Sequence, residues 1–203
     1  MTVREKIVSG ANQLFLKYGI RAVTMDMIAQ ELGLSKRTIY ENFSDKDALI
    51  RDCIDMAMKE KERHFDESIQ NSENAIDALI SMMKFTIQAI NRINPLFFTD
   101  IQKYFAEINV SKIKSGENCM ATEIVSILNK GVQEGLFRKE LNMDLVARIF
   151  SAQSGVMKNQ ELYSTERYSK EEILQTLMLN FIRGIATDKG LTIVNQYTGN
   201  ASV

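Results

Sequence analysis

The run TMDMIAQELGLSKRTIYENFSDKDALI, residues 24–50, decides how the N-terminal part of the chain folds. Thr24 stands before an apolar-periodic stretch and can cap a helix, which Gly33 can end in a left-handed conformation. Ser35 can then cap a second short helix over about residues 35–42. Two short helices joined by a tight turn that contains glycine are typical of a helix-turn-helix.

The first turn of the second helix carries two adjacent cations, Lys36 and Arg37. Cations at a helix N-terminus oppose the helix dipole, so this placement indicates an anionic partner. In a helix-turn-helix the second helix enters the DNA major groove, where Arg37 can pair with guanine and Lys36 with guanine or a phosphate. Lys46 follows near the start of the next helix and is suited to a phosphate. The predicted DNA contacts are Thr24, Ser35, Lys36, Arg37, Thr38, Tyr40, Asn42 and Lys46.

Each of these residues by itself has a simpler explanation. A Lys-Arg pair is more often a solvated surface pair, and threonine and serine are common helix caps. Their order and spacing together are what favour DNA binding.

The net charge, the histidine count and the lengths of the apolar runs exclude several classes of function. The 203 residues carry a net charge of −1, so any surface that attracts nucleic acid must be local. His64, the single histidine, lies in the charged run KEKERHF and is expected on a solvated helix face, which argues against a catalytic triad or a multi-histidine metal site. We therefore predict no catalytic residues, no metal and no cofactor. Neither a signal peptide nor an apolar run long enough to span a membrane is present, so a cytoplasmic protein without a membrane partner is expected.

Helical periodicity dominates the rest of the chain. Further helices are predicted over about residues 74–92, from Pro95 onward, and over about 111–134, 142–161 and 170–187. Residues 188–203 lack this pattern and are predicted to form a loose tail. The expected fold class is all-α with about nine helices.

The N-terminal run resembles the signature of the tetracycline-repressor (TetR) family of bacterial transcription regulators. The matching residues are Thr24, Ile28-Ala29, Leu32-Gly33, Ser35, Tyr40, Phe43, Lys46 and Leu49. The similarity is specific over about residues 5–50 and only architectural beyond them. Arg37 stands where the family often has glycine or proline, and Asn42 where histidine is common, so the operator that is read should differ.

The resemblance implies a helix-turn-helix DNA-binding domain over residues 1–47 and an effector-binding and dimerisation domain over residues 48–187. The dimer interface would use apolar residues of the last two predicted helices: Ile149, Phe150, Val156, Met157, Leu174, Leu177, Met178, Phe181, Ile182 and Ile185. An effector would bind among flexible, aromatic and polar residues of the middle helices: Met82, Phe85, Gln88, Phe98, Gln102, Tyr104, Phe105, Met120 and Gln153. Both groups could instead simply fill the core.

The function implied by the resemblance is repression. A homodimer would bind a palindromic double-stranded DNA operator, and a small-molecule effector would release it. An activator, or an architectural DNA-binding protein without an effector, remains an alternative. A helical small-molecule-binding protein or enzyme is a remote one.

Overall fold

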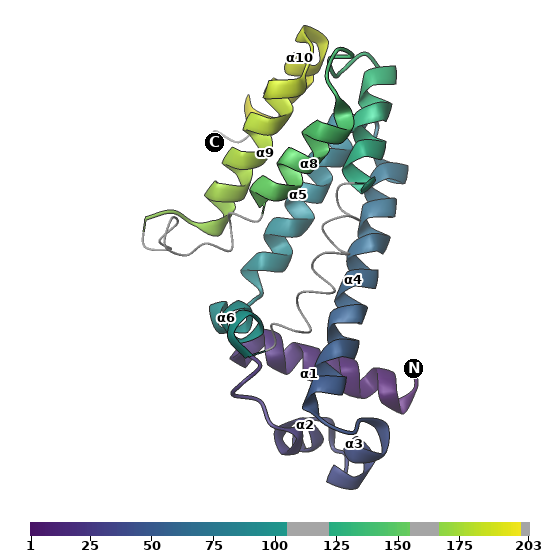
Figure 1. The fold of residues 1–203 in the computed structure, drawn as a ribbon, viewed down its shortest axis with the longest axis vertical. Coiled ribbons are helices and arrows are strands. Elements are labelled where there is room, and N and C mark those ends of the chain that lie inside the picture. Colours follow the sequence, from purple (N-terminus) through teal and green to yellow (C-terminus); the bar gives the residue numbers. More distant parts are fainter. Residues whose placement is uncertain (105–121, 155–166, 200–203) are drawn as a thin grey trace. The chain divides into compact units, whose positions relative to one another are not determined.

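The computed structural model describes residues 1–104, 122–154 and 167–199, and within them the fold is all-α. Figure 1 shows the helices in sequence order. Their bounds are α1 (Val3–Tyr18), α2 (Met25–Leu32), α3 (Lys36–Asn42), α4 (Lys46–Asn71), α5 (Ala75–Asn91), α6 (Pro95–Tyr104), α8 (Met143–Ser154), α9 (Lys170–Ile185) and α10 (Asp188–Gly199). A further helical segment covers residues 122–133. The predicted fold class is confirmed.

Local capping signals explain most of the helix boundaries. The Thr24 hydroxyl accepts a hydrogen bond from the Met27 backbone N–H, and α2 ends at Gly33, whose φ of 63° is left-handed. α6 begins at Pro95, the first helical position, where a missing N–H costs nothing. Ser169 and Glu172 form a capping box at the start of α9.

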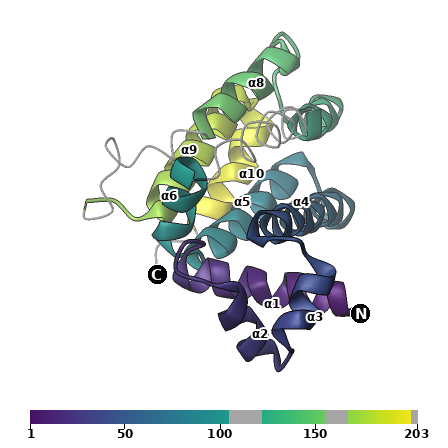
Figure 2. The same cartoon turned by 60° about the horizontal axis from the view of Figure 1, so that its bottom comes forward.

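The contacts divide the chain into two compact units. The first holds residues up to Glu62 and helix α6, and its core is built from fully buried side chains such as Ile7, Ile28 and Ile39. Helices α2 and α3 lie on the same side of α1 (Figure 2), and Phe97 and Ile101 of α6 pack against the same cluster. This packing holds the two short helices rigidly, although neither is long enough to be stable alone.

The second unit runs from Arg63 through α5 and includes residues 122–154 and 167–199. Its core joins buried residues from every helix in it, among them Leu79, Leu128, Phe150 and Ile182. The division between the units falls inside α4, whereas the sequence suggested a functional boundary at residue 47. The difference arises because α4 is one continuous helix and because α6 returns to contact α1.

The predicted loose tail is wrong for residues 188–199, which form α10. Val194 on this helix is fully buried in the core of the second unit. The Thr187 hydroxyl donates to the carbonyl oxygen of Gly135 at 2.8 Å, and the Lys189 ammonium donates to that of Glu134 at 2.9 Å. These long-range contacts stabilise a helix whose own sequence pattern is weak.

No helix in the described part of the chain is both long and apolar enough to cross a membrane.

Candidate nucleic-acid interface

Helix α3 presents one face to the core and the opposite face outward. Ser35 caps it by accepting a hydrogen bond from the Thr38 N–H at 3.0 Å, as predicted. Ile39 is fully buried and Phe43, just after the helix, is 2% exposed, so these two side chains fix the inner face. Tyr40, in contrast, is 53% exposed and lies on the outer part of the helix.

Both cations of the first turn are paired with acidic side chains. Lys36 Nζ lies 2.5 Å from a carboxylate oxygen of Asp26 on α2, and Arg37 Nε lies 2.8 Å from Glu41 Oε1. The sequence suggested a local concentration of positive charge at this helix. The structure corrects this, because each cation has an anion beside it. Neither Asp26 nor Glu41 was among the predicted site residues.

The Lys46 side chain points into the first unit, which differs from its predicted contact with a phosphate. Its ammonium donates hydrogen bonds to the carbonyl oxygens of Ile20, at 2.6 Å, and Val23. Burial lowers the pKa of this ammonium from its ordinary value. Lys46 therefore holds the loop between α1 and α2, and its role in DNA binding would be to position α2 and α3.

The polar residues of the motif are largely engaged with the backbone. The hydroxyl groups of Thr24 and Ser35 serve as caps, and that of Thr24 can still donate its proton to a phosphate. The Ser35 hydroxyl also shares a hydrogen bond with the Thr38 hydroxyl at 2.9 Å. The Asn42 side-chain amide donates to the Thr38 carbonyl oxygen at 2.8 Å. The exposed groups that the structure brings together on α3 are thus Lys36, Arg37, Tyr40 and Glu41.

Arg4 is a residue of this region that sequence reasoning missed. Its guanidinium lies over the Phe43 ring, 4.1 Å from the centroid, and its Nε donates to Asp52 at 3.0 Å. It also donates to the carbonyl oxygen of Asn42, the last residue of α3. Arg4 therefore ties the end of α3 to α1 and α4. No local pattern could have shown this, because its partners lie 38 and 48 positions away.

Comparison with known proteins places this motif in a family. The family model for bacterial regulatory proteins of the tetR family matches residues 7–53, which cover α1 to α3 and the start of α4. The chain belongs to the TetR family of transcriptional regulators. It is therefore a DNA-binding regulator of transcription and not an enzyme.

Two curated relatives are similar over most of their length. The chain is 22% identical over 148 residues to the transcriptional repressor KstR2 of Mycobacterium tuberculosis, covering 71% of this chain and 74% of that protein. It is 26% identical over 137 residues to the transcriptional regulator YhgD of Bacillus subtilis, with coverages of 66% and 69%.

Solved structures share the fold. The ketosteroid transcriptional regulator KstR2 of M. tuberculosis aligns with a TM-score of 0.61 at 19% identity, over 92% of this chain and 96% of that one. SmeT, solved as a complex with triclosan, aligns with a TM-score of 0.70 at 13% identity, over 91% and 92% of the two chains.

The predicted effector residues are scattered in this TetR-family regulator. Met82 and Phe85 on α5 are half-buried, and the Phe85 ring lies 4.0 Å from the His64 ring, centroid to centroid. The expected solvated face is thus partly covered at His64, whose ring contacts α5 while 31% of its side chain stays exposed. Gln88 and Gln153 are exposed. The side chains of Phe98, Gln102 and Tyr104, and the whole of Phe105 and Met120, lie outside the part that the structure describes.

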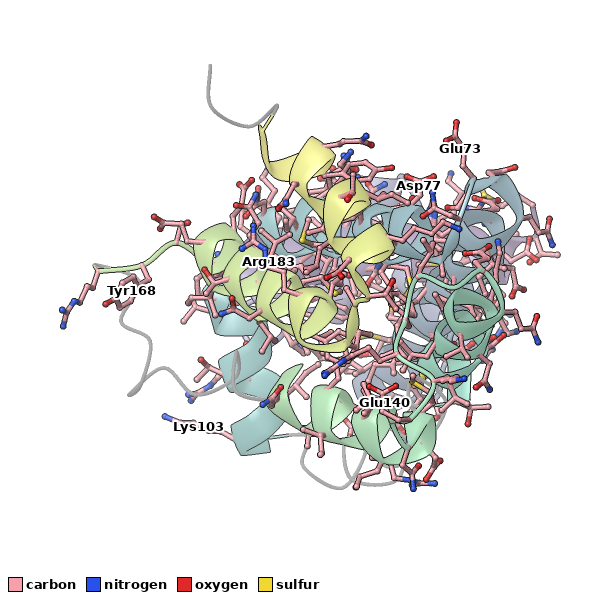
Figure 3. All side chains as sticks on the ribbon, turned by 90° about the horizontal axis from the view of Figure 1, so that it is seen from above. Glu73, Asp77, Lys103, Glu140, Tyr168 and Arg183 are labelled. Atoms are coloured by element: carbon pink, nitrogen blue, oxygen red, sulfur yellow. The ribbon has the colours of Figure 1, made fainter. Side chains whose placement is uncertain are left out.

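A polar cleft of about 300 Å³ opens between the second half of α4 and α5. Its lining includes His64, Glu67, Asn71, Asp77 and Lys84. Asp77 and Glu73, at the start of α5, can be followed in Figure 3. Asp77 already accepts hydrogen bonds from the Tyr197 hydroxyl and the Glu73 N–H, so the inner end of the cleft is internally satisfied.

The predicted dimer residues separate into two groups. Phe150, Leu174, Met178, Ile182 and Ile185 are buried within the second unit itself. Ile149 is 50% exposed, and Leu177 and Phe181 are half-buried. Val156 and Met157 lie outside the described residues. Leu145, one turn before Ile149 on α8, is 54% exposed and lies on the same side of the helix.

Proposed function

We propose that this TetR-family regulator represses transcription as a homodimer bound to a palindromic operator, and that a small-molecule effector releases it. The observation that supports the DNA-binding part most directly is the geometry of α3. Buried Ile39 and Phe43 anchor the helix, while Arg37 projects from the opposite side and Tyr40 is exposed beside it. A short, rigid helix with this polarity fits the major groove. Because its ligand is chromosomal DNA, the protein would act in the bacterial cytoplasm.

The proposed contacts follow from the positions of the side chains. Lys36 reaches base edges or phosphates once its acidic partner Asp26 is exchanged for DNA. The terminal nitrogen atoms of Arg37 can reach them while its Nε stays bonded to Glu41. Thr24 and Ser35, at helix N-termini, offer hydroxyl groups to phosphates, and the nearby backbone N–H groups favour the same anions. Thr38, Tyr40 and Asn42 supply uncharged donors.

The proposed dimer uses the outward faces of α8 and α9. Exposed Leu145 and Ile149 on α8 are joined by half-buried Leu177 and Phe181 on α9, and α8 and α9 contact each other. Apolar side chains left outside a filled core are typical of a surface that a partner covers. A two-fold dimer would place two recognition helices about 34–36 Å apart, which suits a palindromic site.

Relatives support the proposed effector. The fold is shared with a ketosteroid regulator and with a regulator solved with triclosan, so a mostly apolar ligand is favoured for this chain as well. Methionine side chains such as Met82 adapt their shape to such ligands. To release the operator, the effector must bind the DNA-free state more tightly than the DNA-bound state.

The test is selection of bound sequences from random duplex DNA, with wild type, Arg37→Ala and Arg63→Ala compared. Arg63 is a matched control, because it forms the same kind of i,i+4 ion pair, with Glu67, on α4. Wild type and Arg63→Ala should select one palindrome. Arg37→Ala should lose about 1–3 kcal/mol and relax its preference at one base pair per half-site. A wild-type protein that enriches no sequence would contradict the proposal.

Repression is tested separately by transcription in vitro from a promoter that carries the selected palindrome. Added protein should lower the transcript level, and an apolar effector should restore it. Increased transcription would identify an activator instead. Equal operator affinity with and without every saturating candidate ligand would remove the effector from the proposal.

A further inference from the structure

The side of α3 that faces directly away from the core carries an anion, Glu41, as well as a cation, Arg37. Arg37 and Glu41 each lie two residues from buried Ile39, so at 3.6 residues per turn each is about 160° around the helix from it. The two side chains therefore flank the line that faces directly away from the core. Their side chains are 87% and 57% exposed, respectively. If this side of α3 enters the major groove, the Glu41 carboxylate enters with Arg37.

A carboxylate at this place needs a partner, because DNA surrounds the groove with phosphates. In the free protein Glu41 Oε1 accepts a hydrogen bond from Arg37 Nε at 2.8 Å. An exposed i,i+4 pair of this kind stabilises a helix by only a few tenths of a kcal/mol, so helix stability does not account for a buried anion in the groove. The bond uses Nε, so the two terminal nitrogen atoms of the Arg37 guanidinium remain available as donors.

The major groove offers a carboxylate two amino groups as donors, N4 of cytosine and N6 of adenine. Adenine also presents its N7 acceptor beside N6, and a carboxylate, which only accepts hydrogen bonds, repels N7. Cytosine has no such acceptor. Guanine, in turn, presents the O6 and N7 acceptors that suit the terminal nitrogen atoms of Arg37.

We propose that Glu41 is a specificity-determining residue of this regulator, which accepts a hydrogen bond from cytosine N4 while its partner Arg37 reads guanine in the same or the adjacent base pair. The pair held together by the Nε–Oε1 bond would thus act as one unit with a donor side and an acceptor side. The inference rests on the proposed function, in which α3 lies in the major groove. Each half-site should accordingly contain a guanine read by Arg37 and, in the same or the adjacent base pair, a cytosine read by Glu41.

The experiment repeats the duplex selection with Glu41→Gln, Glu41→Ala and a control, Glu31→Gln. Glu31 is an exposed glutamate on α2 of the same unit, so the control makes the same chemical change away from the outer face of α3. Glutamine both donates and accepts and pairs with adenine N6 and N7. Glu41→Gln should therefore change the preferred base from cytosine to adenine at one position of each half-site, with a discrimination of roughly 5- to 100-fold.

The remaining outcomes separate the explanations. Glu41→Ala should lose the cytosine preference at that position without gaining another, and Glu31→Gln should select the wild-type site. Overall affinity is not the readout, because removing any carboxylate near phosphates strengthens binding to all duplexes. If Glu41→Gln relaxes only the guanine position, Glu41 merely orients Arg37 and the proposal is wrong. If it selects the wild-type site unchanged, the proposal is also wrong. If wild type itself selects no site, the proposed function fails first.

Discussion

At the scale of single residues, Lys46 shows how one side chain can hold the loop that leads into a helix-turn-helix. Its ammonium joins the carbonyl oxygens of Ile20 and Val23, and the Asp100 carboxylate on α6 accepts a hydrogen bond from the Arg21 N–H at 2.7 Å. Asp100 is only 7% exposed. The loop that leads into α2 is therefore fixed in two ways: a cation from α4 binds its carbonyl groups, and an anion from α6 binds one of its N–H groups.

Lys46→Ala should lower the free energy of unfolding by about 1–2 kcal/mol, because two loop carbonyl groups lose their donor. Urea denaturation measures the change, with Lys59→Ala, an exposed lysine on the same helix, as the control. The slope of operator affinity against salt should stay close to that of wild type. A slope lowered by about one, with unchanged stability, would show that Lys46 contacts a phosphate instead.

At the scale of elements, α10 is joined to α5 by one half-buried tyrosine. The Tyr197 hydroxyl donates to Asp77 Oδ1 on α5 at 2.7 Å, joining residues 120 positions apart. Burial, and then the hydrogen bond to the Asp77 carboxylate, raises the pKa of Tyr197 to about 12. The stabilisation is therefore complete below the unfolded-state pKa of about 10 and is lost as the pH rises from there toward 12.

Tyr197→Phe should destabilise the protein by about 1 kcal/mol at pH 8, because the carboxylate loses its donor. The gap between wild type and variant should narrow above pH 10, because Tyr197 of the unfolded wild-type chain ionises from there while the folded protein keeps its proton until about pH 12. The measurement is the urea midpoint of wild type and variant at each pH from 8 to 11.5. Tyr168→Phe is the control, since Tyr168 is exposed before α9 (Figure 3). A constant gap across this range would mean that the hydroxyl makes no such bond.

At the scale of the whole molecule, the outward apolar residues of α8 and α9 are the place to test the proposed dimer. Leu145 and Ile149 are each about half exposed, so a glutamate at either position leaves the core of the protomer intact. A charge buried in the proposed interface, however, would have no partner and would oppose association.

Ile149→Glu and Leu145→Glu should therefore convert the protein to a folded monomer that has lost most of its affinity for a palindrome. Sedimentation velocity measures the mass, and circular dichroism shows that the helices are retained. Leu96→Glu, which changes an equally exposed leucine on α6 of the other unit, should leave the dimer unchanged. A wild-type protein that sediments as a monomer at every concentration would refute the proposed interface.

Much of the N-terminal region could be predicted because its signals are local. Thr24, Gly33 and Ser35 act within three or four residues of where they stand, and the structure places each of them as expected. Helical periodicity likewise depends on neighbours three and four positions away, so the all-α class followed from the sequence. The local signals also located the face of α3 that carries Arg37.

The parts that could not be predicted depend on partners far along the chain. Lys36 is paired with Asp26 on another helix, and the apolar stripe of α9 divides into a buried and an outward edge. Helix α10 forms because it packs on α9 and is hydrogen-bonded to α5. The inward direction of Lys46 has the same origin, since its acceptors lie 23 and 26 positions away.

The sequence by itself therefore determined the helices and the motif of this regulator, because capping and periodicity are properties of short segments. Only the tertiary structure decided which charges of the motif remain available to DNA, because an ion pair or a buried ammonium requires two segments to meet.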